Sequence, residues 1–154
     1  MTIDKEAMEI STAMLEQTGK AIMDGDFDTF VTFISLPHVI HTFEGSHQLN
    51  SRADVSVIFE GLQQNFADRR VTDMVRLCIA ARFVGPVTIE TTHETRLLSG
   101  NQIISGPYPS FSILRCVENE WKICHSQYAV NNDGDQSDAL LGKGHHAVPK
   151  TDET

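Results

Sequence analysis

The spacing of apolar residues changes near residue 70, and this change restricts the folds open to the chain more than any other feature. Before that point, apolar residues recur with the period of an amphipathic helix. From Arg70 to Val130 apolar and polar residues alternate, as they do in strands that bury one face. Helices that precede a run of strands indicate the α+β class, in which a layer of helices covers one sheet.

Three helices and one strand are expected in the first half of the chain. The first helix spans residues 3–24 and the second residues 26–35, each with a stripe of apolar residues. A third helix opens at Ser51, because Ser51 followed by Asp54 approximates a capping box. Between the second and third helices, residues 38–45 ("HVIHTFEG") have the composition of a strand.

Four long strands are expected in the second half, and short turns between them predict an antiparallel meander. One long curved sheet can bury all three helical stripes and leave a cavity on its concave side. We expect residues 1–130 to form a single domain. Residues 131–154 are polar and rich in glycine and aspartate, and we expect them to form a mobile tail.

The charge of the chain limits its partners. Its formal net charge is -9, with 12 lysines and arginines against 21 aspartates and glutamates. Binding to nucleic acid or to an anionic membrane surface needs clustered cations, and the sequence has no such cluster. We therefore expect no nucleic-acid or membrane partner, and a ligand that is neutral, apolar or weakly charged unless a local pocket overrides the overall field.

The cysteines and the N-terminus favour a cytoplasmic protein. The chain has three cysteines, each within a strand-like run and none in a CxxC motif: Cys78, Cys116 and Cys124. An odd number in this arrangement predicts free thiols in a reducing compartment. The N-terminus lacks the basic start and apolar stretch of a signal peptide, and no apolar run reaches membrane-spanning length.

Three segments resemble parts of the nuclear transport factor 2-like superfamily, which includes SnoaL-like proteins and ketosteroid isomerases. They are "AIMDGDFDTFVTFI", "PHVIHTFEG" and "EWKICHSQYAV", and the likeness covers about residues 1–130. The resemblance implies a cone-shaped barrel, in which a strongly curved antiparallel or mixed sheet wraps around three N-terminal helices. The superfamily contains enzymes, binding proteins and assembly subunits, so the fold does not give the function.

The resemblance also allows the steroid isomerase mechanism to be tested. It places the carboxylate base of those enzymes on Thr42, their tyrosine near Thr18 and their protonated acid near Pro109. A threonine is no base at neutral pH and a proline side chain donates no hydrogen bond. This excludes the isomerase mechanism unless a gap shifts the alignment, in which case His41 or Glu44 is the nearest substitute base.

Three histidines are the candidate catalytic residues. His41, His93 and His125 each share a strand face with apolar neighbours, which predicts that all three point into the interior. There they could act as general acids or bases, contact a ligand, form a zinc site or simply line the core. The resemblance disagrees on the first strand, where it points Thr42 rather than His41 toward the cavity.

Four further residues are candidate ligand contacts: Thr42, Tyr108, Trp121 and Asp73. Tyr108 lies between two prolines and either borders a cavity mouth or stiffens a turn. Trp121 belongs either to the core or to the cavity wall. Asp73 is the one carboxylate on an apolar strand face, where it either orients a histidine or ends the strand in solvent.

The motifs of common enzymes are missing: the chain has no GxSxG, no HExxH, no CxxC and no glycine-rich loop after a strand. The first hypothesis is therefore a protein that binds a small apolar or aromatic molecule. If it is an enzyme, the resemblance suggests a lyase, isomerase or cyclase that works by proton transfer, without cofactor or metal. The alternatives are a non-catalytic module that forms a homodimer through an exposed sheet face, and an accessory subunit like that of ring-hydroxylating oxygenases.

Overall fold

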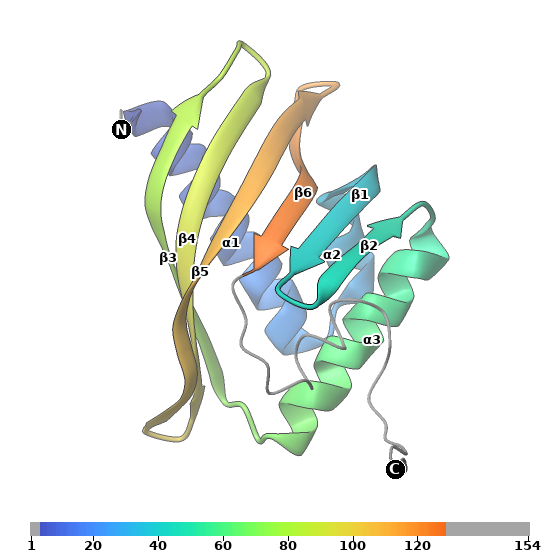
Figure 1. The fold of residues 1–154 in the computed structure, drawn as a ribbon, viewed down its shortest axis with the longest axis vertical. Coiled ribbons are helices and arrows are strands. Elements are labelled where there is room, and N and C mark those ends of the chain that lie inside the picture. The colour runs from blue at the N-terminus through green and yellow to red at the C-terminus, as the bar shows by residue number, and fades with distance from the viewer. Residues whose placement is uncertain (1–3, 129–154) are drawn as a thin grey trace.

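The computed structural model describes residues 4–128, which form three helices and six strands (Figure 1). The predicted α+β class is confirmed. The predicted tail at residues 131–154 lies outside the described residues. The helices are α1 (Lys5–Asp24), α2 (Phe27–Thr32) and α3 (Arg52–Asp68). The strands are β1 (Ile34–Thr42), β2 (Gly45–Leu49), β3 (Asp73–Phe83), β4 (Thr88–Ser99), β5 (Gln102–Val117) and β6 (Glu120–Tyr128).

Capping side chains fix where the long helices begin. The carboxylate of Asp4 accepts a hydrogen bond from the backbone N–H of Ala7 at 3.1 Å, and α1 starts there. Ser51 caps α3 as predicted, because its Oγ accepts from the N–H of Asp54 at 3.1 Å. The Asp54 carboxylate in turn accepts from the N–H of Asn50 at 2.8 Å, which completes a variant of the capping box.

The six strands form one mixed sheet in the order β2-β1-β6-β5-β4-β3. The predicted meander is confirmed for β3 to β6, which pair antiparallel with their neighbours. Strand β1 runs parallel to β6 and antiparallel to β2. Among the described residues β2 and β3 are the free edges, so the expected barrel is wrong: the sheet is curved but open (Figure 1).

The region between the second and third helices differs from the prediction. Helix α2 ends at Thr32, and β1 already begins at Ile34 rather than at residue 38. Pro37 lies inside β1, where the pairing with β6 shifts its register between Ile34 and Val39. Such an irregularity accommodates a proline, which has no N–H to give to a sheet. Strand β2 is a further element that the sequence pattern did not reveal.

Two apolar clusters join the helices to the inner face of the sheet. One lies where α3 meets β1, β2 and β4, and includes Ile40, Leu49 and Phe59. The other lies where α1 packs on β3, β4 and β5, and includes Met14 and Ile89. Polar side chains are also buried on the inner face: His38, Thr91, His93, Thr95, Ser110, Ser112 and Ser126. Buried polar groups of this kind need hydrogen-bond partners, which makes the inner face of the sheet suited to a ligand site.

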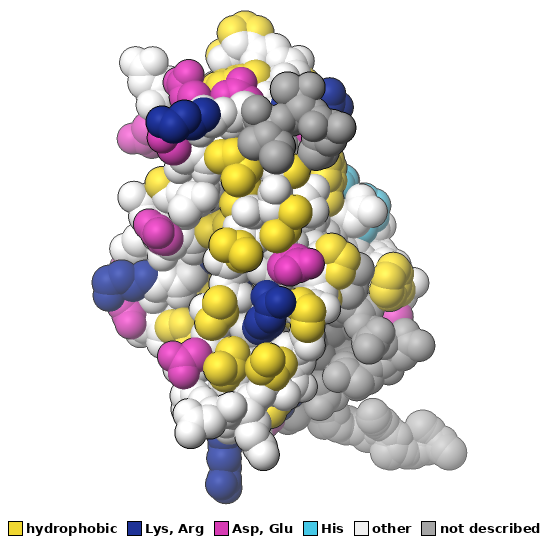
Figure 2. Space-filling view, turned by 90° about the vertical axis from the view of Figure 1, so that its left-hand side faces the viewer, with side chains coloured by type: hydrophobic (Ala, Val, Ile, Leu, Met, Phe, Trp, Pro, Cys, Tyr) yellow, Lys and Arg dark blue, Asp and Glu magenta, His cyan; other side chains and the backbone are white. Residues whose placement is uncertain are grey.

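The outer face of the sheet carries exposed apolar side chains. On β3 they are Val75, Leu77 and Ile79, which are 47%, 57% and 42% exposed. Figure 2 shows hydrophobic side chains gathered along the middle of one face of the molecule, with acidic and basic side chains among them. The three thiols are free, as predicted. None of the helices in the described part of the chain is long and apolar enough to cross a membrane.

Candidate functional site

A largely enclosed cavity of about 60 Å³ lies between the helices and the inner face of the sheet. Most of its wall is apolar, with side chains from all three helices and from β1, β2 and β6. No aspartate or glutamate among residues 4–128 lines it. Five polar residues line it: Thr18, His38, Arg76, Ser126 and Tyr128. An apolar cavity with a few convergent polar groups is the usual form of a small-molecule site.

His38 is buried with both ring nitrogens in hydrogen bonds. Its Nδ1 lies 3.0 Å from the carbonyl oxygen of Ile123, so Nδ1 carries the proton and donates it. Its Nε2 lies 3.1 Å from Oγ of Ser126 and accepts the hydroxyl proton. Burial lowers the pKa of His38 to about 4, so the ring is neutral near pH 7.

Arg76 reaches from β3 across the inner face to helix α1. Its Nη2 donates to the carbonyl oxygen of Leu15 and to Oγ1 of Thr18, both at 2.7 Å. Gly19 leaves room for the guanidinium, since a Cβ at that position would lie 3.1 Å from Nη2. Burial lowers the pKa of Arg76 from its ordinary value, yet an arginine keeps its charge at physiological pH.

His93 lies on the same inner face and is only 3% exposed. In the sheet it is opposite Cys78 on β3 and Ser110 on β5. Neither ring nitrogen of His93, nor Oγ of Ser110, has a hydrogen-bond partner among the described residues. Burial, together with the charge of Arg76, lowers the pKa of His93 to about 3. His93 is therefore a neutral imidazole with one donor and one acceptor unused.

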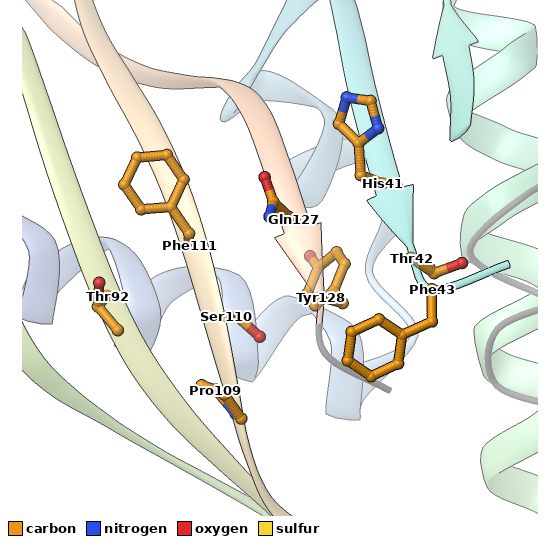
Figure 3. A pocket seen from close by; sticks show the side chains of 9 residues that line it. All are labelled: His41, Thr42, Phe43, Thr92, Pro109, Ser110, Phe111, Gln127 and Tyr128. Carbon is orange, nitrogen blue, oxygen red and sulfur yellow. The ribbon is translucent and has the colours of Figure 1, made fainter. Parts of the chain in front are cut away.

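A groove of about 470 Å³ lies where β6 ends beside β1, and Figure 3 shows the side chains that line it. They are His41, Thr42, Phe43, Thr92, Pro109, Ser110, Phe111, Gln127 and Tyr128. Tyr128 lines both this groove and the inner cavity. Its side chain is therefore part of the wall that separates the two spaces.

The expectation that three histidines share the interior is wrong for two of them. His41 and His125 lie on the outer face, with ring centroids 5.1 Å apart, and Phe111 contacts His125 edge-on. On β1 the inward residues are His38 and Ile40, so His41 points outward.

A β-bulge explains His125. Leu114 pairs with Ile123 and Ile113 pairs with His125, so Cys124 is the extra residue of β6. Ile123 lines the cavity, and the bulge turns His125 to the other face. The three candidate histidines therefore form neither a zinc set nor an acid–base cluster. Within residues 4–128 no three metal-binding side chains come together.

The remaining candidates are scattered. Thr42 lines the groove, and Tyr108 is half-buried against the cluster that contains Ile40. Trp121 lines neither of these two spaces; it packs edge-on against Phe83 at 6.0 Å and lines a separate hollow of about 620 Å³ beside α1. Asp73 is exposed at the first residue of β3, where it accepts a hydrogen bond from Thr72, and it lines neither the cavity nor the groove.

None of the five polar residues that line the cavity is among the site residues predicted from the sequence. In the first strand the apolar residues around His41 favour it over His38 as the inward histidine, whereas the structure places His38 inside. Arg76 shares a strand face with Met74 and Cys78, and a charged residue between two apolar neighbours was the available signal.

No protein-family model matches the sequence, and a search of curated proteins gives no significant match. Solved structures do match. A domain of unknown function with a cystatin-like fold from Nostoc punctiforme superposes with a TM-score of 0.64 at 17% identity, over 87% of this chain and 83% of the other. A proposed dehydratase of the NTF2-like family from Streptomyces avermitilis superposes with a TM-score of 0.60 at 14% identity. The match covers 82% of this chain and 97% of the other.

A third solved structure is a proposed aromatic ring hydroxylase from Novosphingobium aromaticivorans. It superposes with a TM-score of 0.58 at 12% identity, over 84% of this chain and 92% of the other. Likeness at such low identity concerns the fold and carries no activity with it. The chain has the nuclear transport factor 2-like fold, as its sequence motifs predicted.

Proposed function

We propose that this protein binds a small molecule in the inner cavity, with the groove beside Tyr128 as the entrance. The observation that carries the proposal is the largely enclosed cavity itself, where an apolar wall surrounds a few polar groups. A packed protein interior leaves few voids larger than a water molecule, so a void of this kind supports a binding site.

The size of the cavity limits what it can hold. Its volume of about 60 Å³ is roughly twice the ~30 Å³ share of one water molecule in the liquid. A benzene ring needs more, since a cavity of about 150 Å³ is a size that binds benzene. An aromatic ligand therefore requires the side chain of Tyr128 to move toward the groove, which offers about 470 Å³.

Binding is better supported than proton transfer by histidine. A general base works best when its pKa lies near the working pH. The pKa values of His38 and His93 are lowered to about 4 and about 3, and both nitrogens of His38 already have partners. His41 and His125 lie on the opposite face of the sheet from the cavity. We therefore place ligand binding before catalysis.

The test is a titration of the full chain with neutral compounds of increasing size: acetamide, isobutanol and phenol. The ring resonances of His38 are followed by NMR, because His38 lines the cavity. We expect saturable shifts of these resonances and a melting temperature that rises with ligand concentration. Unchanged His38 resonances with every compound would contradict the proposal.

Two valines of α3 give a matched pair of variants. Val55→Leu adds a methylene group to a side chain that is 1% exposed and lines the cavity. Val57→Leu makes the same change where the side chain is 51% exposed. We expect Val55→Leu to weaken binding at least about tenfold, since filled space excludes the ligand, and Val57→Leu to leave binding unchanged.

A second function, self-association, is favoured by the outer face of the sheet. Val75, Leu77 and Ile79 expose apolar surface on one edge strand, beside the ion pairs Arg82–Glu90 and Arg96–Glu94. A self-complementary patch of apolar and paired charged groups suits a twofold interface. We propose that a second copy of the chain covers it.

Sedimentation velocity over a range of concentrations tests self-association. We expect a species of twice the 17.1 kDa chain mass. Leu77→Glu places a charge in the centre of the patch and should weaken the dimer at least about tenfold. Val57→Glu, on the exposed side of α3, should not. A chain that stays monomeric at all concentrations would rule this second function out.

A further inference from the structure

We propose that Arg76 binds a carboxylate group of the ligand inside the cavity. This inference rests on the proposed function, because it assumes that a ligand enters the cavity, and it adds the chemical class of that ligand. The net charge of the chain is -9, which disfavours anions over most of the surface. The local environment of Arg76 is the exception, and its contacts are the reason.

Within residues 4–128 the charge of Arg76 has no acidic partner in an ion pair. Its two hydrogen bonds go to neutral oxygens, the carbonyl of Leu15 and the hydroxyl of Thr18. A cation taken out of water without an opposite charge is costly, and binding an anion offsets that cost.

Three other polar residues of the cavity, His38, Ser126 and Thr18, already make hydrogen bonds. Both nitrogens of His38 are used, one of them by the hydroxyl of Ser126. The hydroxyl of Thr18 donates to the carbonyl oxygen of Met14 at 2.8 Å while it accepts from Arg76. Both bonds of Arg76 leave from Nη2, although a guanidinium has five N–H donors. The guanidinium therefore has more N–H donors than its two hydrogen bonds use, and a carboxylate can accept from such donors.

The position of nearby acids decides from which side an anion approaches. Arg76 also borders an outer cleft between α1 and β3, and Glu16 and Asp73 line that cleft. Their carboxylates repel an anion there and offset the attraction of Lys20, which also lines the cleft. The inner cavity has no acid in its wall among the described residues, and its volume of about 60 Å³ has room for a carboxylate with one or two further carbons. An arginine binds such a planar group through two parallel hydrogen bonds.

The experiment compares acetate with acetamide, which have nearly the same shape but differ in charge. Each is titrated into the full chain at pH 7 and constant ionic strength, and the His38 ring resonances report binding in the cavity. We expect acetate to bind at least about tenfold more tightly than acetamide, because hydrogen bonds to a charged group are stronger than neutral ones.

Three variants assign the preference to Arg76. In Arg76→Met the preference for acetate should disappear, whereas Arg76→Lys, which keeps the charge, should retain part of it. Arg82→Met removes an arginine from the outer face, where it pairs with Glu90, and should retain the full preference. If Arg76→Met does not fold, the comparison of acetate with acetamide in the wild type and in Arg76→Lys still tests the inference.

The outcomes separate this inference from the function on which it rests. If acetamide shifts the His38 resonances and acetate binds no more tightly, the cavity is a ligand site but the carboxylate inference is wrong. If acetate binds without shifting them, or keeps its preference in Arg76→Met, the anion binds elsewhere and the inference is also overturned. If neither these two compounds nor isobutanol and phenol reach the cavity, the proposed function fails and the inference fails with it.

Discussion

Oγ1 of Thr18 lies 2.7 Å from Nη2 of Arg76, and this contact ties helix α1 to strand β3 beside the inner cavity. The same hydroxyl donates to the carbonyl oxygen of Met14 at 2.8 Å, which directs its lone pairs toward the guanidinium. A small hydroxyl side chain thus accepts a hydrogen bond from a cation that has no acidic partner in the described part of the chain. The contact has a measurable consequence for stability.

Replacing Thr18 by valine keeps the shape of the side chain and removes the oxygen. One N–H of Arg76 then loses an acceptor in a buried place, which should cost about 1–3 kcal/mol of unfolding free energy. Thr32→Val is the control, because its hydroxyl makes a similar bond to the carbonyl of Thr29 but is exposed. That change should cost less than about 0.5 kcal/mol. Urea denaturation measures both, and equal losses would contradict the role given to Thr18.

The two buried histidines predict how stability depends on pH. His38 and His93 have pKa values of about 4 and about 3 in the folded protein, against 6.5 for a free histidine. Between these pH values the unfolded chain binds more protons than the folded chain. The contribution of the two neutral histidines to the unfolding free energy is therefore fully present above pH 6.5 and is lost as the pH drops toward 4. Each histidine contributes a slope of about 1.4 kcal/mol per pH unit within that window.

Single replacements separate the two contributions. His93→Gln removes one titrating group, so the slope between pH 6 and pH 5 should fall by about 1.4 kcal/mol per pH unit. His38→Gln should reduce it by the same amount, and the double replacement by twice as much. Unfolding free energies from urea denaturation at several pH values provide the test. Slopes that match the wild type in both variants would show that neither histidine is buried and neutral.

The sequence predicts most of the fold because periodicity survives in long elements. The burial of β4 alternates without interruption from Ile89 to Leu97, and His93 was correctly placed inside for that reason. Strand β2 is only five residues long, which is too short for alternation to be distinguished from a loop. The sequence pattern predicts a helix at the start of β1, because Ile34 fits the apolar stripe of the preceding helix equally well.

The candidate site is harder to predict because its members depend on irregular pairing. The bulge at Cys124 reverses the alternation of β6, so Trp121 and His125 do not share the role that a regular strand would give them. A single sequence also does not predict which residues of distant elements contact one another. Arg76 meets Thr18 across 58 positions, and no local pattern in either segment indicates this contact.

The pKa of His125 on the outer face should depend on the neighbouring ring of His41. The pKa of His125 is lowered first by its partial burial and then by the charge that His41 acquires beside it. His41→Gln removes that charge, so the pKa of His125 should rise. His47→Gln, on β2, makes the same chemical change at a position that is not among the ring neighbours of His125. NMR titration of the ring resonances measures the pKa of His125. An unchanged pKa of His125 in His41→Gln would refute the coupling.

Two glycines of the sheet should respond differently to the same substitution. Gly106 has a φ of 93°, and a Cβ there would collide with the backbone carbonyl oxygen of Thr95 on the neighbouring strand. Gly100 has a φ of 62° in a turn, and a Cβ there would have no atom within 4 Å. Gly100→Ala should therefore lower the unfolding free energy only by the cost of placing alanine in the left-handed conformation, about 1–2 kcal/mol. Gly106→Ala adds a clash that only a backbone shift relieves, and should cost about 3 kcal/mol or more.

Thermal and urea denaturation of the two alanine variants measure this difference. Thr95 lies opposite Arg76 in the sheet, so a displacement of β4 at Thr95 also moves the wall that holds the guanidinium. We therefore expect Gly106→Ala to weaken acetate binding as well as stability, and Gly100→Ala to change stability alone. Equal losses of stability in the two variants would mean that β4 and β5 do not approach as closely at Gly106 as described.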